Sequence, residues 1–71
     1  MDVQIKQFNS RIDRLEAEFE RNRQQLLHLA EENRRGTSDY DTLLERNLRI
    51  NDEIHSLLTA IWKLEEPQQH Q

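Results

Sequence analysis

Among the residue types in this chain, histidine is the one best suited both to bind a metal ion and to transfer a proton near neutral pH. The three histidines are His28, His55 and His70. Two histidines on one helix share a metal ion when they lie about three to five residues apart, and no pair here has that spacing. The chain has no cysteine, which excludes a thiolate zinc site, a cysteine nucleophile and a disulfide. We therefore expect no bound metal and no cofactor.

The sequence signatures of catalysis are also missing. The chain has one glycine, Gly36, so it cannot form a glycine-rich loop around a phosphate, and it has no nucleophile elbow. We expect a protein that is not an enzyme, with no catalytic and no cofactor-binding residues. Its function must then come from a surface that the secondary structure presents to a partner.

Apolar residues recur with the period of an α-helix in two long segments. Residues spaced alternately by three and four run from Ile5 to Leu29, and again from Tyr40 to Leu64. One asparagine interrupts each series, Asn22 in the first and Asn47 in the second. The strict alternation of a β-strand does not occur. The sequence predicts two long helices and an all-α fold.

Between the two series, residues 31–39 contain no apolar side chain. Gly36 suits the left-handed position that follows many helices, and Thr37, Ser38 and Asp39 are all suitable N-cap residues. Stop and start signals next to each other predict an antiparallel two-helix hairpin with a coiled-coil-like seam and a short turn around Gly36.

The hairpin is expected to form one domain, residues 1–66. Its predicted parts are helix 1 at about 3–34, the turn at 35–38, helix 2 at about 39–66, and a disordered tail at 67–71 that begins with Pro67.

A continuous rod is the alternative to the hairpin. The two apolar series keep one heptad phase, since Ile5 and Tyr40 are five heptads apart. A single coiled coil would, however, place Asn33 and Gly36 at its seam, and a glycine in a helix interior costs about 1 kcal/mol. Such a rod would be roughly 95 Å long, against roughly 45 Å for the hairpin. The sequence favours the hairpin.

Folding the chain at Gly36 predicts which residues meet across the seam. It places Asn22 opposite Asn51 and Leu26 opposite Asn47. Facing asparagines can fix the register at some cost in stability, or they can simply lie at a wet edge. Both interpretations stay open. The predicted core consists of ten apolar residues: Ile12, Leu15, Phe19, Leu26, Leu29, Leu43, Ile50, Ile54, Leu57 and Ile61.

The second helix carries a further stripe beside its seam. Its members are spaced by four and three residues: Leu44, Leu48, Asn51, His55, Leu58 and Trp62. One antiparallel neighbour covers an apolar arc of roughly 100°, and the first helix has only Leu27 and Ala30 outside its own seam. In one interpretation Leu44 and Leu58 are flanking core positions, and Leu48 and Trp62 are scattered surface residues. In the other, the stripe docks another protein or a second copy.

Tryptophan favours docking, because it is enriched as an anchor at protein interfaces. The predicted partner-binding residues are Leu44, Leu48, His55, Leu58 and Trp62.

Charge and size narrow the choice of partner. The 71 residues contain 10 Lys and Arg against 14 Asp and Glu, and the arginines alternate with glutamates. No basic stripe for nucleic acid or an anionic membrane results. The chain has no long apolar run, so we expect a soluble cytoplasmic protein without a membrane span. A scaffold this small without a disulfide or a metal usually needs a partner chain to be stable, and a homodimer is possible when it is alone.

The turn and the second helix resemble a known family. The residues that carry the likeness are 32–64, with the sequence ENRRGTSDYDTLLERNLRINDEIHSLLTAIWKL. This segment has an Arg-Gly turn, an aromatic Tyr40 four residues later, and a final cluster of Ile61, Trp62 and Leu64. It resembles the small co-chaperones of type III secretion needle subunits, the YscE/PscE/EscE-like helical hairpins. The likeness covers about residues 24–66, and the first helix matches only in length and heptad character.

The resemblance implies a virulence-associated chaperone role in the bacterial cytoplasm. It implies that the hairpin binds a tetratricopeptide-like chaperone and helps to keep a needle subunit soluble. The alternative is a self-associating coiled coil, either a four-helix-bundle dimer or a parallel rod, that acts as a structural oligomerisation or adaptor module.

Overall fold

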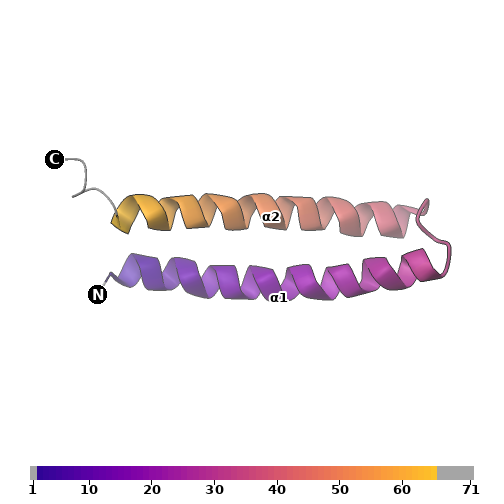
Figure 1. The fold of residues 1–71 in the computed structure, drawn as a ribbon, viewed down its shortest axis with the longest axis horizontal. Helices are drawn as coiled ribbons and strands as arrows, with labels where there is room; N and C mark the ends of the chain where they lie inside the picture. The colour runs from indigo at the N-terminus through magenta and orange to yellow at the C-terminus, as the bar shows by residue number, and fades with distance from the viewer. Residues whose placement is uncertain (1, 66–71) are drawn as a thin grey trace.

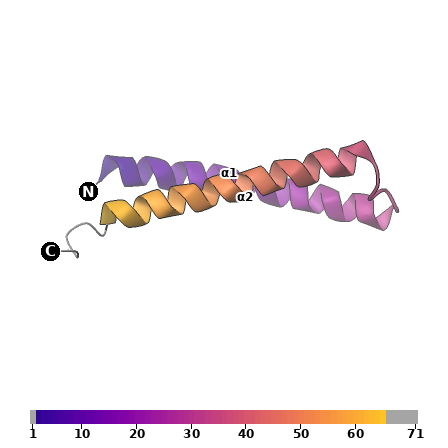
Figure 2. The ribbon, with the colours of Figure 1, turned by 90° about the horizontal axis from the view of Figure 1, so that it is seen from above.

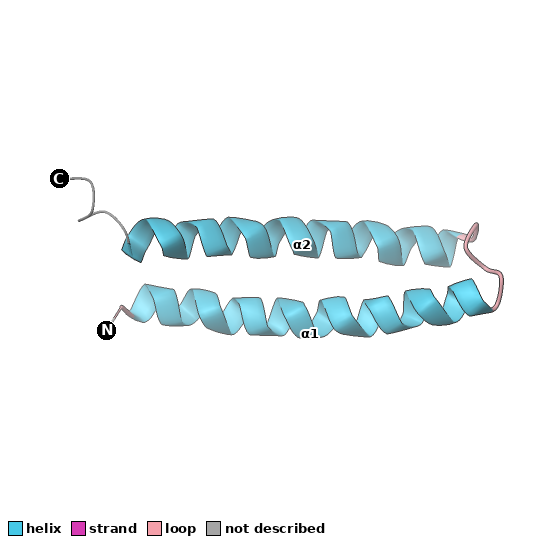
Figure 3. Ribbon diagram, viewed as in Figure 1, coloured by secondary structure: helices cyan, strands magenta, loops and turns pink. Residues whose placement is uncertain are grey.

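Two antiparallel helices make up the fold. The computed structural model describes residues 2–65, with α1 at Val3–Glu31 and α2 at Ser38–Glu65. Figures 1 and 2 show the helices side by side along nearly their whole length, in a body of 55 × 20 × 15 Å. No strand occurs within these residues (Figure 3). The all-α hairpin is confirmed, and the chain does not form a continuous rod.

The side chain of Asp2 caps the beginning of α1. Its carboxylate accepts hydrogen bonds from the backbone N–H groups of Gln4 at 2.8 Å and Ile5 at 3.4 Å. The first N–H groups of a helix have no partner within the helix, so an N-cap carboxylate satisfies two of them and favours a helix start at this residue.

The end of α1 differs from the expectation that helix 1 reaches residue 34. Asn33 has a positive φ of 61°. The N–H of Asn33 donates to the carbonyl of Ala30 at 3.1 Å, and the N–H of Arg34 donates to the carbonyl of Leu29 at 2.8 Å. These two bonds form a Schellman motif with asparagine at the left-handed position. The helix therefore ends at Glu31, because asparagine also tolerates this conformation and precedes the glycine.

The predicted turn at 35–38 with a left-handed Gly36 is thus wrong. The φ of Gly36 is not positive, and Gly36 lies within a turn that the N–H of Thr37 closes on the carbonyl of Arg34 at 3.4 Å. The connection comprises residues 32–37. It is longer than expected and begins earlier.

Thr37 is the N-cap of α2. Its Oγ1 accepts a hydrogen bond from the N–H of Tyr40 at 3.3 Å and donates one to the carbonyl of Arg34 at 2.8 Å. Asp39 and Asp41 lie in the first turn, where negative charge interacts favourably with the helix dipole. Of the three predicted N-cap candidates, the structure uses the first. The expected helix end at residue 66 and the expected tail at 67–71 lie outside the described residues.

The core is a single seam between the helices. All ten predicted core residues are buried or half-buried. Ile50 is the most buried, with 2% of its surface exposed, and Ile12, Leu29 and Ile61 are also buried. The helical spacing of three and four residues was enough to identify them, because a helix of this kind buries one face.

The register across the seam differs from the expected one by about one helical turn. Asn22 Nδ2 donates to Asn47 Oδ1 at 2.9 Å, and Asn47 Nδ2 donates to the carbonyl of Phe19 at 3.1 Å. The expected pairs, Asn22 with Asn51 and Leu26 with Asn47, are therefore wrong. Asn47 is 5% exposed, so the asparagine pair belongs to the seam and does not lie at a wet edge.

The observed register has a simple physical reason. It sets the apolar seam of α1 against the apolar seam of α2, whereas the expected register would have left Asn47 opposite Leu26. In the observed alignment both Asn22 and Asn47 have a hydrogen-bond partner while the apolar residues of the two seams cover each other. The stripe on α2 is consequently left outside the seam.

Candidate protein-docking surface

The hairpin has two long edges at which the helices meet, and ion pairs close one of them. Arg11 pairs with Glu53 on this paired edge. Arg46 forms two hydrogen bonds to the Glu18 carboxylate, at 2.8 and 3.2 Å. The hydrogen bond from Arg46 lowers the pKa of Glu18 below its ordinary value of 4.5. Both pairs link α1 to α2, so this edge carries matched charges and covers the seam.

The opposite edge, which we call the open edge, lacks such links. Among residues 2–65, the ion pairs that join α1 to α2 all lie on the paired edge. The open edge instead carries the α2 stripe, defined as Leu44, Leu48, Asn51, His55, Leu58 and Trp62. The heptad positions explain the contrast between the two edges. On α2, the residues at one flank of the seam are charged, and most residues at the other flank are apolar.

The predicted partner-binding residues are all exposed on this one face. The exposed fraction is 41% for Leu44, 59% for Leu48, 50% for Leu58 and 58% for Trp62. His55 lies among them and is also exposed. Leu44 and Leu58 are thus only partly covered by α1, and about half of each side chain remains accessible to a partner.

A shallow groove runs between the stripe and α1. Two adjoining concavities of about 330 Å³ each lie along it and share Phe19 and Asn51. Leu26, Leu44 and Leu48 line the first concavity, while Ile54 and two glutamates line the second. The groove thus has an apolar floor and one apolar wall.

The second wall of the groove belongs to α1 and is acidic. It contains Glu16 and Glu20, and Asp13 lies one turn further along the same edge. Arg23 donates two hydrogen bonds to Glu20, at 3.0 and 2.8 Å, and Gln24 donates a third at 2.9 Å. These bonds lower the pKa of Glu20 from 4.5 to about 2. Because Arg23 is matched by Glu20, the wall keeps the negative charge of Asp13 and Glu16.

Sequence reasoning missed the contribution of α1 to this surface. Phe19 and Leu26 were predicted as core residues, and they are half-buried residues that also form the groove floor. Leu27 adds a further exposed apolar side chain on α1, with 48% of its surface accessible. The sequence signal for this double role is weak, because a seam residue becomes a groove residue only when the neighbouring edge is left open.

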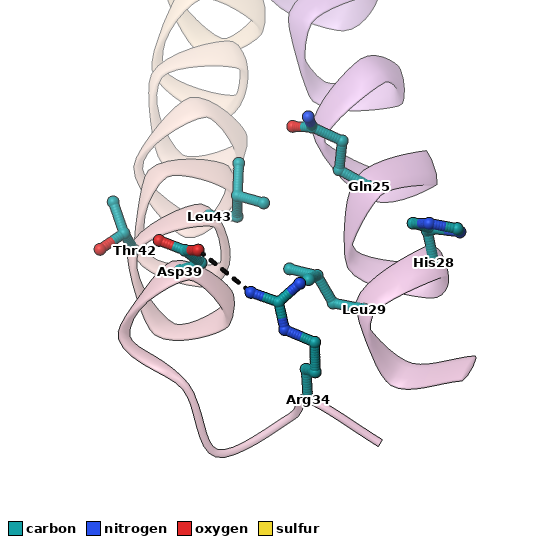
Figure 4. Close-up of a pocket in the computed structure, with 7 residues that line it drawn as sticks. All are labelled: Gln25, His28, Leu29, Arg34, Asp39, Thr42 and Leu43. Carbon is teal, nitrogen blue, oxygen red and sulfur yellow. Dashed lines mark hydrogen bonds and ion pairs between the residues drawn. The ribbon is translucent and has the colours of Figure 1, made fainter. Parts of the chain in front are cut away.

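A more polar concavity of about 360 Å³ lies at the loop end of the paired edge (Figure 4). It is lined by Gln25, His28, Leu29, Arg34, Asp39, Thr42 and Leu43. Figure 4 shows the guanidinium of Arg34 pointing toward the carboxylate of Asp39, at 3.5 Å. His28 Nε2 lies 3.1 Å from Glu32, which Arg34 also approaches at 3.5 Å. These polar groups pair with one another, so the open edge is the stronger candidate for binding.

The described residues offer neither a metal site nor a membrane span. No group of three or more His, Cys, Asp or Glu side chains in residues 2–65 is placed to hold a metal ion. Neither α1 nor α2 is long and apolar enough to cross a bilayer.

Comparison with known protein families, curated proteins and solved structures finds no match for this chain. The functional assignment therefore depends on the geometry of the hairpin.

Proposed function

We propose that this chain is a non-enzymatic protein-binding hairpin whose open edge docks a helical segment of another protein. The observation that carries this proposal is the contrast between the two edges. One edge is closed by Arg11–Glu53 and Glu18–Arg46, and the other presents an apolar stripe beside an apolar groove. An amphipathic helix that lies in such a groove is a recurring mode of protein recognition.

The exposed surface is large enough to matter energetically. Complete burial of a leucine side chain contributes about 1.5–3 kcal/mol. The three leucines of the stripe and Trp62 are about half exposed, so covering each contributes roughly 1 kcal/mol or more. Tryptophan is also enriched among the residues that dominate binding energy. Together these side chains offset part of the entropy cost of association.

The groove walls define the chemistry of the preferred partner. Leucine or similar side chains of a partner helix would pack on the α2 stripe, while Asp13 and Glu16 would face the other flank of that helix. Lysine or arginine on that flank would give complementary charge, which favours the correct partner and speeds association. We therefore expect an amphipathic partner helix with one basic flank.

In its most concrete form, the proposal is a bacterial cytoplasmic co-chaperone. It would bind a tetratricopeptide-like chaperone and help to keep a type III secretion needle subunit soluble. The resemblance of residues 32–64 supports this form, and so does the position of the exposed stripe on α2, the helix that carries the resemblance. The alternative function, a structural oligomerisation module, would use the same stripe.

Position-dependent photocrosslinking in the native cell tests the proposal. A photoreactive residue replaces Leu48 or Leu58 on the stripe, and matched controls carry it at Arg14 or Arg21 on the exposed outer face of α1. We expect both stripe positions, and neither control position, to capture the same protein. Capture that does not depend on position, or no capture at the stripe, would contradict the docking proposal.

A double variant and the identity of the captured protein complete the test. Leu58→Ala combined with Trp62→Ala should abolish capture through a photoreactive residue at Leu48 while helicity by circular dichroism persists, because both side chains are largely exposed in the hairpin. The co-chaperone form requires that the captured protein is a helical-repeat chaperone and that a needle subunit accompanies it. A captured protein of another kind would eliminate that form and leave docking intact.

A further inference from the structure

We infer that a second copy of this chain covers the α2 stripe when no partner is bound, in an antiparallel dimer whose two-fold axis passes between Asn51 and His55. The inference goes beyond the proposed function, because it concerns the chain alone and needs no particular partner. It rests on the order of side chains along the stripe and on the charges beside it.

The stripe has the same character when read from either end. Its residues are Leu44, Leu48, Asn51, His55, Leu58 and Trp62, with two apolar residues at each end and two polar residues in the centre. The spacing of four, three, four, three and four is also symmetric. In an antiparallel pair, Leu44 faces Trp62 of the second copy and Leu48 faces Leu58. A two-fold interface requires this self-complementarity, since each contact must occur twice.

The polar centre fixes the register of the dimer. Asn51 lies opposite His55 of the second copy, and the symmetry repeats this pair. An amide and an imidazole both donate and accept hydrogen bonds, so the two side chains can satisfy each other. A slip by one heptad would set His55 against Leu58 or Asn51 against Leu48, which leaves polar groups without partners. Both residues are exposed in the single hairpin, so the second copy brings them together without disturbing the core.

The outer flank of α2 favours the antiparallel arrangement. Glu45 lies beside the start of the stripe and Lys63 beside its end. An antiparallel second copy brings Glu45 close to Lys63, whereas a parallel copy would bring each charge close to its own equivalent. Within the described residues 2–65, the ion pair of Glu45 is with Arg49, at 3.6 Å on the same helix. The antiparallel contact therefore adds attraction on this flank.

The inner flank predicts an unusual dependence on salt. The symmetry axis places the acidic α1 walls of both copies on the same side, and each contains Asp13 and Glu16. Like charges repel and salt screens them, while the contact between leucines does not weaken. The inner flank brings together four like charges, two from each copy, against two Glu45–Lys63 attractions on the outer flank that salt also screens. The dimer should therefore become tighter at higher ionic strength. A heterologous helix with a basic flank would show the opposite trend and would displace the second copy most readily at low salt.

The chain exposes more surface than a compact protein of its mass. Its accessible surface is 5707 Å², whereas a compact protein of 8.6 kDa exposes about 4,700 Å². The difference follows from the elongated body of 55 × 20 × 15 Å. A second copy on the stripe would bury part of this surface.

Thiol crosslinking tests the register, because the chain has no native cysteine. Leu48→Cys and Leu58→Cys are prepared as separate variants, mixed, and treated with a short bismaleimide. The mixture should give a covalent dimer. Neither variant alone should do so, because the two equivalent positions would be roughly 15 Å apart along the helices. A covalent dimer from Leu48→Cys alone, or none from the mixture, would overturn the proposed register.

Sedimentation equilibrium tests the dimer itself. The purified chain should approach twice its monomer mass of 8.6 kDa, and more so at high salt. Leu44→Ala with Trp62→Ala should raise the dissociation constant of the dimer at least about tenfold without loss of helicity. The control is Val3→Ala, which should leave the dissociation constant unchanged, because Val3 is 67% exposed but lies outside the stripe. A monomer at every concentration overturns the dimer but not the docking proposal. Stripe crosslinks in the cell that reach only a second copy support the dimer and overturn heterologous docking.

Discussion

Replacing the only glycine of the chain should stabilise the hairpin. Gly36 does not adopt a positive φ, and a Cβ atom built on it meets no other atom within 4 Å. Alanine fits this backbone and restricts the unfolded chain, so Gly36→Ala should raise the free energy of unfolding by about 0.4–1 kcal/mol. The opposite result is expected at Asn33, whose φ is 61°. Asn33→Ala should lower the free energy of unfolding by roughly 1–2 kcal/mol, because alanine is strained in the left-handed region.

Thermal unfolding followed by circular dichroism measures both effects. A change of 1 kcal/mol moves the Tm of a domain this small by about 4–8 °C. We expect Tm to rise for Gly36→Ala and to fall for Asn33→Ala, at one fixed protein concentration. Asn33→Gly is the matched control and should preserve or raise Tm, since glycine takes the left-handed position without strain. If Gly36→Ala lowers Tm while Asn33→Ala does not, then α1 ends at the glycine, and the Schellman motif at Asn33 is refuted.

Three further predictions concern the seam and one surface carboxylate. Asn22→Leu alone should lower the free energy of unfolding by about 1–3 kcal/mol, because it leaves the buried Oδ1 of Asn47 without a donor. In a double-mutant cycle measured by urea unfolding, Asn22→Leu with Asn47→Leu should recover most of this loss. Additive losses would contradict the asparagine pair. Ile50→Ala should lower the free energy of unfolding, measured in urea, by about 2–5 kcal/mol, because Ile50 is 2% exposed. The control Leu48→Ala should leave the helicity of the dilute chain unchanged. Hydrogen bonds from neighbouring side chains lower the pKa of Glu20 from 4.5 to about 2, so the stabilisation they provide is complete above pH 4.5 and is lost as the pH falls toward 2. Carboxyl NMR titration checks this, and a Glu20 midpoint near 4.5 would be inconsistent with these bonds.

The asparagine pair and the two edges together explain why the stripe remains outside. The bond between Asn22 and Asn47 fixes the register, and that register sets Arg46 within reach of Glu18. A shift by one turn would break both contacts at once. The polar contacts of the hairpin therefore stabilise the arrangement that keeps the apolar stripe exposed.

Much of this protein could be predicted from its sequence. The helical spacing from Ile5 to Leu29 and from Tyr40 to Leu64 identified both helices and every member of the expected core. It also identified an apolar stripe that α1 could not cover, and each predicted partner-binding residue is exposed. These properties are accessible to sequence reasoning because they depend on residues three or four positions apart on one helix.

The position of the turn and the register were not accessible in this way. The sequence pointed to Gly36 as the left-handed residue, and only the backbone showed that Asn33 takes this conformation and ends α1. It predicted Asn51 as the partner of Asn22, one helical turn from the Asn47 that the folded hairpin pairs with it. Neighbouring turns of a helix present nearly the same face, so the local pattern does not distinguish one register from the next. The choice between them, and with it the difference between a closed and an open edge, is made by contacts between residues far apart in the sequence.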